Sequence, residues 1–443
     1  MNINEISTRL KECGVVGCGG AGFPSYGKLS DKAETIVLNC AECEPLFRVH
    51  RQLLADFTFE IFSALQEIKN AVDARNVIIA IKPSYTEAIE AMESIINNFS
   101  GFSIRYLTKA YPAGDEIITI HEVTTKIIEP GKLPITKGVI LYNVETMLNA
   151  YHAIFENKPV THKFLTITGA VKKPTTVKLP IGTSFKEALK YADGASISDF
   201  VYLNGGIMTG SIGSGNDLVT KTTNAIIILP KEHPVVYKKT ISVKNDIKRA
   251  MSACCQCQSC TDLCSRHLMG YPIKPHMVMR AVAKGMDSDI KTCLEAFTCS
   301  SCGLCEMYSC PQDLSPRNII ADLKKNLRMA GITPPKEQAF TGVSHERRYK
   351  RIPEKRLIAR VGVEQYDKDA PMDYTEYDIK RVQIKIAQGI GALPIVCVKV
   401  GDKVKIGDVL AGASEKLGVS IHSSIDGKVS SINGNIIMIT KEG

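Results

Sequence analysis

The first 155 residues alternate between two hydrophobic patterns. Two stretches, 51–68 and 85–99, carry apolar residues at the spacing of a helix that packs on one face. Continuous apolar runs that predict strands lie at 35–40, 76–81 and 138–143. Strands that alternate with helices indicate an α/β domain, which we place at residues 1–158.

The pattern changes three times further along the chain. Short strands broken by turns, with one helix among them, predict a small β-grasp domain at 159–235. Residues 245–330 are helical and rich in cysteine, and 331–380, rich in proline and charge, are a linker or an extended wrap. The remainder, 381–443, is all β with Gly-Asp and Asn-Gly turns. The whole is a multidomain α/β protein.

Length, composition and charge indicate the number of domains and the cellular compartment, but they say little about the function. A chain of 443 residues is too long to fold around one compact core, so several domains are expected. Its longest apolar runs, such as 225–229, are far shorter than the roughly 20 residues of a membrane span. The N-terminus has no secretory pattern, so we expect a cytoplasmic protein whose thiols stay reduced. The net charge of +9 is mild. Its densest part, 345–360, is interpreted as a solvated linker, because no nucleic-acid-binding motif accompanies it.

Cysteine spacing carries the strongest chemical signal. The first run contains Cys254, Cys257, Cys260 and Cys264, and the second contains Cys299, Cys302, Cys305 and Cys310. Zinc sites pair their ligands across a longer loop, whereas three cysteines at successive CxxC steps plus a fourth are typical of [4Fe–4S] proteins. The sequence therefore predicts two [4Fe–4S] clusters, with zinc as the alternative.

In two-cluster ferredoxins the fourth cysteine of each run serves the other cluster. We therefore assign Cys254, Cys257, Cys260 and Cys310 to one cluster, and Cys299, Cys302, Cys305 and Cys264 to the other. Ser265 replaces the usual proline, and the last cysteine of the second run follows after four residues where three are usual. Neither departure removes a ligand. Cys255 falls outside the register and is expected to pack as a spare thiol.

A glycine-rich stretch, 17–28, reads "GCGGAGFPSYGK". Its glycine spacing matches a dinucleotide-binding fingerprint, with Glu42 further on as the acidic residue. Pro24 and Gly27 would interrupt the helix that this motif requires, so we reject that interpretation. The alternative is a loop whose bare backbone lets a flat cofactor approach, with Lys28 supplying charge for a phosphate.

Four motifs resemble a known family in order and spacing: this glycine stretch, "NCAECEPL" at 39–46, "YPAGDE" at 111–116 and "NVETMLN" at 143–149. They resemble the flavin and NADH site of the complex I flavoprotein subunit, and still more the C subunit of the Rnf complex and the soluble cobalamin reductases of bacterial microcompartments. The resemblance covers almost the whole chain. It implies a complex I flavoprotein-like α/β domain, a soluble-ligand-binding β-grasp module, a ferredoxin-like two-cluster domain and a C-terminal barrel-sandwich hybrid. The position of that last module favours the cobalamin-reductase branch.

The resemblance also implies ligand contacts. For FMN it implies Gly17, Gly19, Gly20, Lys28, Asn39, Glu42, Asn143 and Thr146. For NADH it implies Phe23, Glu44 and Tyr111, with Glu116 near both ligands. The chain departs from complex I at Cys18 and Cys40, which together with Cys43 raise the alternative of a redox-active thiol site; packing of small residues is favoured. The tail resembles lipoyl carriers, but the sequence around Lys416 does not match the modification motif, so a structural barrel is favoured.

The function implied is transfer of electrons from NADH through FMN and two clusters to an external acceptor, with no acid–base residue required. The acceptor is a cobalamin, an adenosyltransferase, or a partner reductase of amino-acid fermentation such as proline reductase. The base-off corrinoid motif is absent from the sequence. A flavin-free electron-wiring scaffold is the alternative from another class. Self-association is left open, and residues 4–14 are either a microcompartment-targeting peptide or, as favoured, an ordinary first helix.

Overall fold

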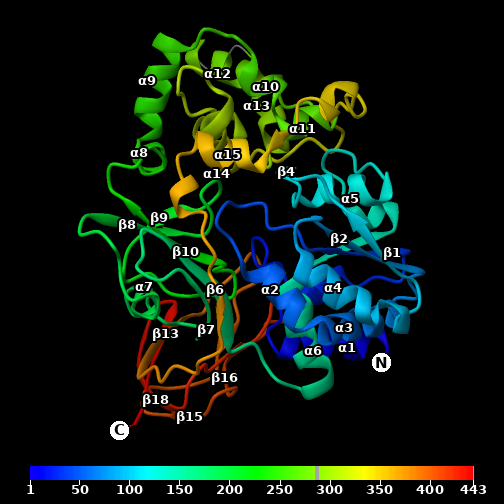
Figure 1. Ribbon diagram of the computed structural model, residues 1–443, viewed down its shortest axis with the longest axis vertical. Helices are drawn as coiled ribbons and strands as arrows, with labels where there is room; N and C mark the ends of the chain where they lie inside the picture. The colour runs from blue at the N-terminus through cyan, green and yellow to red at the C-terminus, as the bar shows by residue number, and fades with distance from the viewer. Residues whose placement is uncertain (285–288, 443) are drawn as a thin grey trace.

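The computed structural model describes residues 1–284 and 289–442. Positions 285–288, in the expected cluster domain, and 443, in the expected C-terminal module, lie outside the described residues. Figure 1 shows the cysteine-rich helices at one end of the long axis and the C-terminal strands at the other, with the N-terminal and β-grasp modules between them.

The N-terminal module contains a parallel four-stranded sheet in the order β3-β2-β1-β5. Its strands are β1 (Thr35–Asn39), β2 (Asn76–Ile81), β3 (Phe102–Tyr106) and β5 (Val139–Asn143). Its helices are α1 (Ile3–Glu12), α2 (Val49–Asp56), α3 (Thr58–Ala71), α4 (Thr86–Ile95), α5 (Glu116–Thr124) and α6 (Val144–Glu156). The single helical stretch expected at 51–68 is two helices, because the backbone leaves the helical region at Phe57 (φ −126°, ψ 34°).

The two faces of this sheet pack against different partners. One face buries Ile36, Leu38 and Val77 against the module's own helices. The opposite face buries Val37 and Leu141 in a cluster that also contains α5 and apolar residues of the cysteine-rich helices. Burial of this second face fixes the cysteine-rich segment directly against the N-terminal domain.

The β-grasp module is a six-stranded mixed sheet in the order β12-β7-β6-β10-β8-β9. Its elements are β6 (His162–Gly169), β7 (Thr175–Pro180), α7 (Phe185–Ala188), β8 (Phe200–Asn204), β9 (Ser211–Gly213), β10 (Ala225–Pro230) and β12 (Met372–Asp373). The last strand comes from the segment 331–380, which also supplies β11 (Ile352–Pro353) to pair with β4 (Ala110–Tyr111). That segment, with α15 (Glu354–Arg360), therefore lies across two modules as a wrap.

The cysteine-rich segment consists of short helices joined by loops that carry several of its cysteines. Its helices are α8 (Pro234–Thr240), α9 (Val243–Ala253), α10 (Ser259–Asp262), α11 (Ser265–Leu268), α12 (Pro275–Lys284), α13 (Ile290–Glu295) and α14 (Pro316–Met329). The domain limits expected at 235 and 245 fall inside α8 and α9, so the helical segment begins at Pro234, directly after the β-grasp sheet. In the described residues, no helix is long and apolar enough to cross a bilayer.

The C-terminal module consists of two small antiparallel sheets, β13-β19-β18-β15 and β14-β16-β17. Its strands are β13 (Arg381–Lys385), β14 (Ile395–Val396), β15 (Lys403–Val404), β16 (Val409–Gly412), β17 (Ile421–His422), β18 (Gly427–Asn433) and β19 (Ile436–Thr440). Their inward residues, such as Val382 and Ile437, share one hydrophobic core with Leu165 and Val177 of the β-grasp sheet. Shared burial joins the two β modules into one body.

Candidate functional site

A cavity of about 590 Å³ opens where the N-terminal, β-grasp and cysteine-rich modules meet. We call it the central cavity. All twelve residues that the resemblance implied for FMN and NADH line it: Gly17, Gly19, Gly20, Phe23, Lys28, Asn39, Glu42, Glu44, Tyr111, Glu116, Asn143 and Thr146. Residues more than 120 positions apart in the sequence thus converge on one space.

The stretch 17–28, here called the glycine loop, folds back on itself beside the cavity. The N–H of Gly17 donates to the carbonyl oxygen of Phe23 at 2.8 Å, which closes the loop. A Cβ built at Gly19 would lie 3.2 Å from Cγ of Asn143, whereas a Cβ at Gly20 would meet no protein atom within 4 Å. Gly20 therefore borders open space that a side chain would fill, as expected of backbone that a flat cofactor approaches.

Charged and amide side chains surround this space. Lys28 donates from Nζ to Glu116 Oε1 at 3.1 Å and to the carbonyl oxygen of Leu141 at 2.8 Å. Glu116 lies in the first turn of α5. Asn39 ends β1 and donates to the carbonyl oxygen of Gly114 at 2.9 Å, while Asn143 caps α6. Strand ends and helix starts thus place these groups along one wall.

Glu42 is buried and held by α2. Its carboxylate accepts the N–H of His50 at 2.8 Å and Nε of Arg51 at 3.0 Å. Burial alone would raise the pKa of this carboxyl, but the charges of Arg51 and His50 outweigh it, and the pKa lies below its ordinary value. The carboxylate is therefore a fixed negative charge in the cavity wall.

Glu44 joins the N-terminal module to the β-grasp module. One carboxylate oxygen accepts the N–H of Met208 at 2.7 Å, and the other accepts the N–H of Thr209 at 2.9 Å and its hydroxyl at 2.6 Å. A carboxylate offers about four acceptor positions, so these three bonds leave capacity for a ligand hydroxyl.

Tyr111 connects the central cavity to the second cysteine run. Its buried hydroxyl donates to the carbonyl oxygen of Cys302 at 2.6 Å. Cys302 itself lines the cavity, as do Ser300 and Arg266. Arg266 forms a largely buried ion pair with Asp115 at 2.7 Å. The cavity wall therefore continues without interruption from the glycine loop to a cysteine.

Several lining residues were missed by sequence reasoning. His50, Asp115, Thr209, Asn224, Arg266 and Ser300 all border the cavity. Asp115 stood inside a quoted motif, and Arg266 follows the first cysteine run by two residues. Ser300 lies inside the second cysteine run, directly after Cys299. His50, Thr209 and Asn224 come from segments without a chemical pattern, and only the meeting of the modules brings them to the cavity.

The eight cysteines form two groups in space. Cys264 is a close electrostatic neighbour of Cys299 and Cys302, and Cys305 of all three. We call these four the inner group. Cys254, Cys257, Cys260 and Cys310 line one surface hollow and form the outer group. Each run's fourth cysteine thus joins the three cysteines of the other run.

Both groups fit iron–sulfur clusters by their chemistry. Burial, followed by the neighbouring thiols of Cys310, Cys254 and Cys257, raises the pKa of Cys260 to about 12. Such crowded thiols become thiolates only where a bound cation compensates their charge. Backbone N–H groups point at two sulfurs, from Ser301 to Cys299 at 3.3 Å and from Leu314 to Cys310 at 3.4 Å.

Among the described residues no three His, Cys, Asp or Glu side chains converge on one ion position. One expectation about this region is wrong: Cys255 is exposed at the outer hollow and does not pack.

Cys18, Cys40 and Cys43, the three cysteines considered as a redox site, all have thiols with a raised pKa. Burial raises the pKa of Cys18 to about 12, and its sulfur accepts from Asn149 Nδ2 at 3.5 Å. Cys40 is also buried, with its pKa well above the ordinary value for the same reason. Burial raises the pKa of Cys43, which lines the cavity, to about 12. These thiols are in the unreactive protonated form.

Comparison with family models matches three parts of the chain. Residues 10–152 match the Nuo51 FMN-binding domain, 253–315 a 4Fe-4S dicluster domain, and 365–442 the RnfC barrel sandwich hybrid domain. A crystal structure of an NAD+-reducing [NiFe]-hydrogenase shares the fold, with a TM-score of 0.52 and 18% identity over 76% of this chain and 64% of that chain. These matches define an electron-transfer oxidoreductase with an FMN-binding domain and a 4Fe-4S dicluster domain.

Full-length relatives narrow this class. The chain is 37% identical over its whole length to the cobalamin reductase PduS of Salmonella typhimurium, covering 97% of it, and 38% identical to that of Citrobacter freundii, covering 98% of this chain and 96% of the relative. It therefore belongs to the PduS family of cobalamin reductases. The C subunit of the Na(+)-translocating ferredoxin:NAD(+) oxidoreductase complex of Acetobacterium woodii is 30% identical over 60% of this chain and 59% of its own length.

Proposed function

We propose that this protein transfers electrons from NADH, through FMN and two [4Fe–4S] clusters, to a cobalamin acceptor. The observation that carries the proposal is the unbroken wall of the central cavity from Gly20 in the glycine loop to Cys302 in the inner group. The acceptor class follows from the full-length relatives, which are named cobalamin reductases. We place the protein in the cytoplasm, where reduced thiols suit cluster binding.

A bound flavin supplies the conversion between two-electron hydride transfer and one-electron steps, and a bound cluster accepts single electrons. The chain's own residues position these groups and exclude water. Gly17, Gly19 and Gly20 provide the bare backbone for the flavin ring, and Lys28 provides positive charge. Asn39, Asn143 and Thr146, with the fixed charge of Glu42, complete the FMN contacts.

The nicotinamide nucleotide is proposed to lie toward the β-grasp side of the cavity. Phe23 offers an aromatic face, Tyr111 lines the approach to Cys302, and Glu44 faces the ribose. The remaining acceptor position on the Glu44 carboxylate favours a free 2′-hydroxyl, while its charge repels a 2′-phosphate.

The eight cysteines of the inner and outer groups are the proposed ligands of the two clusters. The inner group borders the cavity, while the outer group contains an exposed cysteine, Cys257, at the surface. Electrons are therefore proposed to enter at the inner group and leave from the outer group. An open cavity of about 590 Å³ at the glycine loop speaks against the flavin-free scaffold.

Cofactor analysis of anaerobically purified protein tests the proposal. We expect about eight iron and eight sulfide per chain, as two cubanes require, and one bound FMN. Gly20→Val should abolish FMN binding by filling the open space at the loop, and leave iron unchanged. Zinc in place of iron, or no flavin after reconstitution, would overturn the proposal. A cobalamin that accepts no electrons while a purified amino-acid reductase does would reassign the acceptor.

The nucleotide is tested separately. Unmodified protein should oxidise NADH faster than NADPH. Glu44→Gln should narrow that preference by about 1 to 3 kcal/mol, the scale of a charge-assisted hydrogen bond. Equal rates with both nucleotides before substitution would show that Glu44 does not face the ribose.

A further inference from the structure

The glycine loop has two faces, and only one of them borders the central cavity. Gly17, Gly19 and Gly20 line that cavity. The remaining glycines of the loop, Gly22 and Gly27, are absent from its lining and contact the C-terminal module. The function proposed above explains the first face and leaves the second unexplained.

At Gly22 the backbone of the glycine loop lies directly against the backbone of Gly389 in the C-terminal module. This residue has a φ of +71°, and a Cβ built on it would lie 2.8 Å from Cα of Gly389. A Cβ built on Gly389 would in turn lie 2.9 Å from the carbonyl carbon of Gly22. The N–H of Ile390 donates to the carbonyl oxygen of Ala21 at 3.0 Å. Two glycines from opposite ends of the chain are thus required for this close approach.

A second contact holds the C-terminal end of the loop. Tyr26 donates its hydroxyl hydrogen to the carbonyl oxygen of Gly418 at 3.0 Å, and its hydroxyl oxygen accepts the N–H of Gly418 at 3.1 Å. A Cβ at Gly27 would lie 2.8 Å from Leu417. The segment around Lys416, at the place where a carrier's lysine would lie, is therefore packed on the glycine loop through the backbone of Gly418 and the side chain of Leu417.

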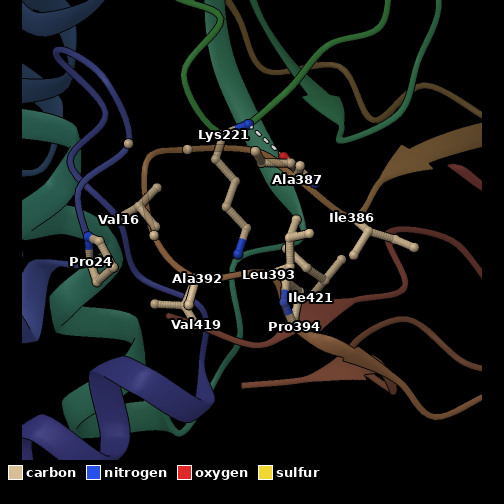
Figure 2. A pocket seen from close by; sticks show the side chains of 14 residues that line it. Val16, Pro24, Lys221, Ile386, Ala387, Ala392, Leu393, Pro394, Val419 and Ile421 are labelled. Carbon is tan, nitrogen blue, oxygen red and sulfur yellow. Dashed lines mark hydrogen bonds between the residues drawn. The ribbon is translucent and has the colours of Figure 1, made fainter. Parts of the chain in front are cut away.

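A buried lysine joins the same elements (Figure 2). Lys221, from the β-grasp module, donates from Nζ to the carbonyl oxygens of Gly14 at 2.7 Å and Ser420 at 3.1 Å. Its backbone N–H donates to Gln388 Oε1 at 2.9 Å. Figure 2 shows its side chain lying between Val16 and Pro24 on one side and the C-terminal strands on the other. The surrounding space, about 30 Å³, has room for water and not for a ligand.

We propose that the C-terminal module positions the glycine loop for flavin, with Gly389 as a positioning residue that touches the loop and not the cofactor. Two independent contacts, at Gly22 and Tyr26, fix the back face of the loop while its front face borders the cavity. Lys221 supports them by joining Gly14, just before the loop, to Ser420 of the C-terminal module. In this role the module is a structural part of the flavin site and not a carrier. The inference rests on the proposed binding of FMN.

The test substitutes Gly389 by Ala, which places a methyl group against the Gly22 carbonyl. Gly412→Ala is the matched control, because its Cβ would lie 3.5 Å from Cys397, an ordinary contact in the same module. We expect Gly389→Ala to weaken FMN binding at least tenfold, measured by quenching of flavin fluorescence. The control should change it less than twofold, and iron content should stay the same in both.

Hydrogen exchange of the flavin-free protein separates this inference from the proposed function. Gly389→Ala should speed amide exchange across 17–28 before any flavin is added, and Gly412→Ala should not. Faster exchange without a change in FMN affinity would overturn the positioning role. Unmodified protein that binds no FMN would overturn the proposed function, while the exchange result would still report on the contact.

Tyr26→Phe provides a milder variant should Gly389→Ala fail to fold. It removes both hydrogen bonds to Gly418 and keeps the ring. We expect a two- to fivefold loss of FMN affinity with exchange increased at 25–28. Unchanged affinity and exchange in Tyr26→Phe would overturn the proposal.

Discussion

The inner and outer cysteine groups have nearly the same sequence pattern and opposite surroundings. In the inner group Cys305 is buried, and the neighbouring Glu306 is ion-paired with Arg317 at 2.7 Å. In the outer group Cys257 is exposed, and Met251 in the helix before it is 61% exposed. Two cysteines of the inner group, Cys264 and Cys299, pack toward the parallel sheet of the N-terminal module, whereas Cys254 and Cys310 of the outer group pack against a separate cluster.

This difference arises from packing and not from ligand spacing. Cys264 and Cys299 of the inner group pack against the hydrophobic cluster that contains Val37 and Leu141, so burial of a sheet face fixes their loops. The outer group has a small core of its own, built on Ala250, Met279, Leu314 and Ile319. Two cysteine groups with similar spacing thus have different positions. The inner group borders the central cavity, and the outer group is exposed to an acceptor.

The largest loss of iron and of electron delivery is expected when a cysteine of the inner group is substituted. Cys302→Ala removes a cysteine that lines the cavity and receives the Tyr111 hydrogen bond on its carbonyl oxygen. We expect iron to fall to about half or less, because the groups interlock through Cys264 and Cys310. Electron delivery to a cobalamin acceptor should drop at least about a hundredfold, while bound flavin remains. Iron analysis and anaerobic assays check this.

Cys255→Ala is the control for that substitution, since Cys255 is exposed and belongs to neither group. It should keep the full iron content and the full rate. Loss of iron in this variant would show that the grouping of the outer cysteines is wrong.

Substitution of an outer-group cysteine should affect iron content and electron delivery less than substitution of Cys302. Cys257→Ala removes an exposed ligand, so the inner cluster should survive and iron should fall by no more than about half. Reduction of a small artificial acceptor should continue, while delivery to cobalamin falls about tenfold or more. If Cys257→Ala also lost the inner cluster, the two groups would be one cooperative unit and the contrast between them would fail.

A smaller effect is expected from a substitution that tests the contact between the central cavity and the inner group. Tyr111→Phe removes the hydrogen bond to the Cys302 carbonyl and should cost about 0.5 to 1.5 kcal/mol of stability. The electron paramagnetic resonance signal of the inner cluster should change, and that of the outer cluster should not. Tyr349, 74% exposed, supplies the control variant Tyr349→Phe. Equal changes in both signals would argue against a local effect.

The fold was predictable where the pattern was local. The strands at 35–40, 76–81 and 138–143 are present because continuous apolar runs need a sheet buried on both faces. The helical stretch 51–68 was wrong in one respect, since amphipathic spacing continues through Phe57 although the backbone does not. The expected limits at 235 and 245 fall inside α8 and α9, because these helices carry no cysteine that would mark where the helical segment begins.

The site was predictable where short motifs held its residues, and all twelve implied contacts line one cavity. Residues such as Asn224 and Thr209 could not be found, since their role depends on the β-grasp loops meeting the N-terminal module. The same limit applies to Gly22 and Gly27. Gly22 completes the spacing of a dinucleotide fingerprint and Gly27 interrupts the helix that this fingerprint requires, but only the structure shows that they lie against Gly389 and Leu417.

The effect on electron transfer is expected to be smallest at Lys221, which belongs to neither cysteine group and separates stability from iron content. Burial lowers the pKa of its amine to about 7, and the thiols of Cys18 and Cys13, which also face it, only partly oppose this. His422, the other titratable group beside it, has a pKa lowered to about 3 by burial and by Lys221, and stays neutral in this range.

Between pH 7 and 10.5 the unfolded chain holds a proton on Lys221 that the folded chain releases, because the ordinary pKa is 10.5. Stability should therefore rise with pH in this window, by at most about 1.4 kcal/mol per pH unit, relative to Lys221→Met. Thermal unfolding from pH 7 to 9 measures the difference, with the exposed Lys172→Met as control. Iron content should be the same in all three proteins. Parallel pH slopes for the unmodified protein and Lys221→Met would show that the buried amine stays protonated, and that its bonds to Gly14 and Ser420 compensate its burial.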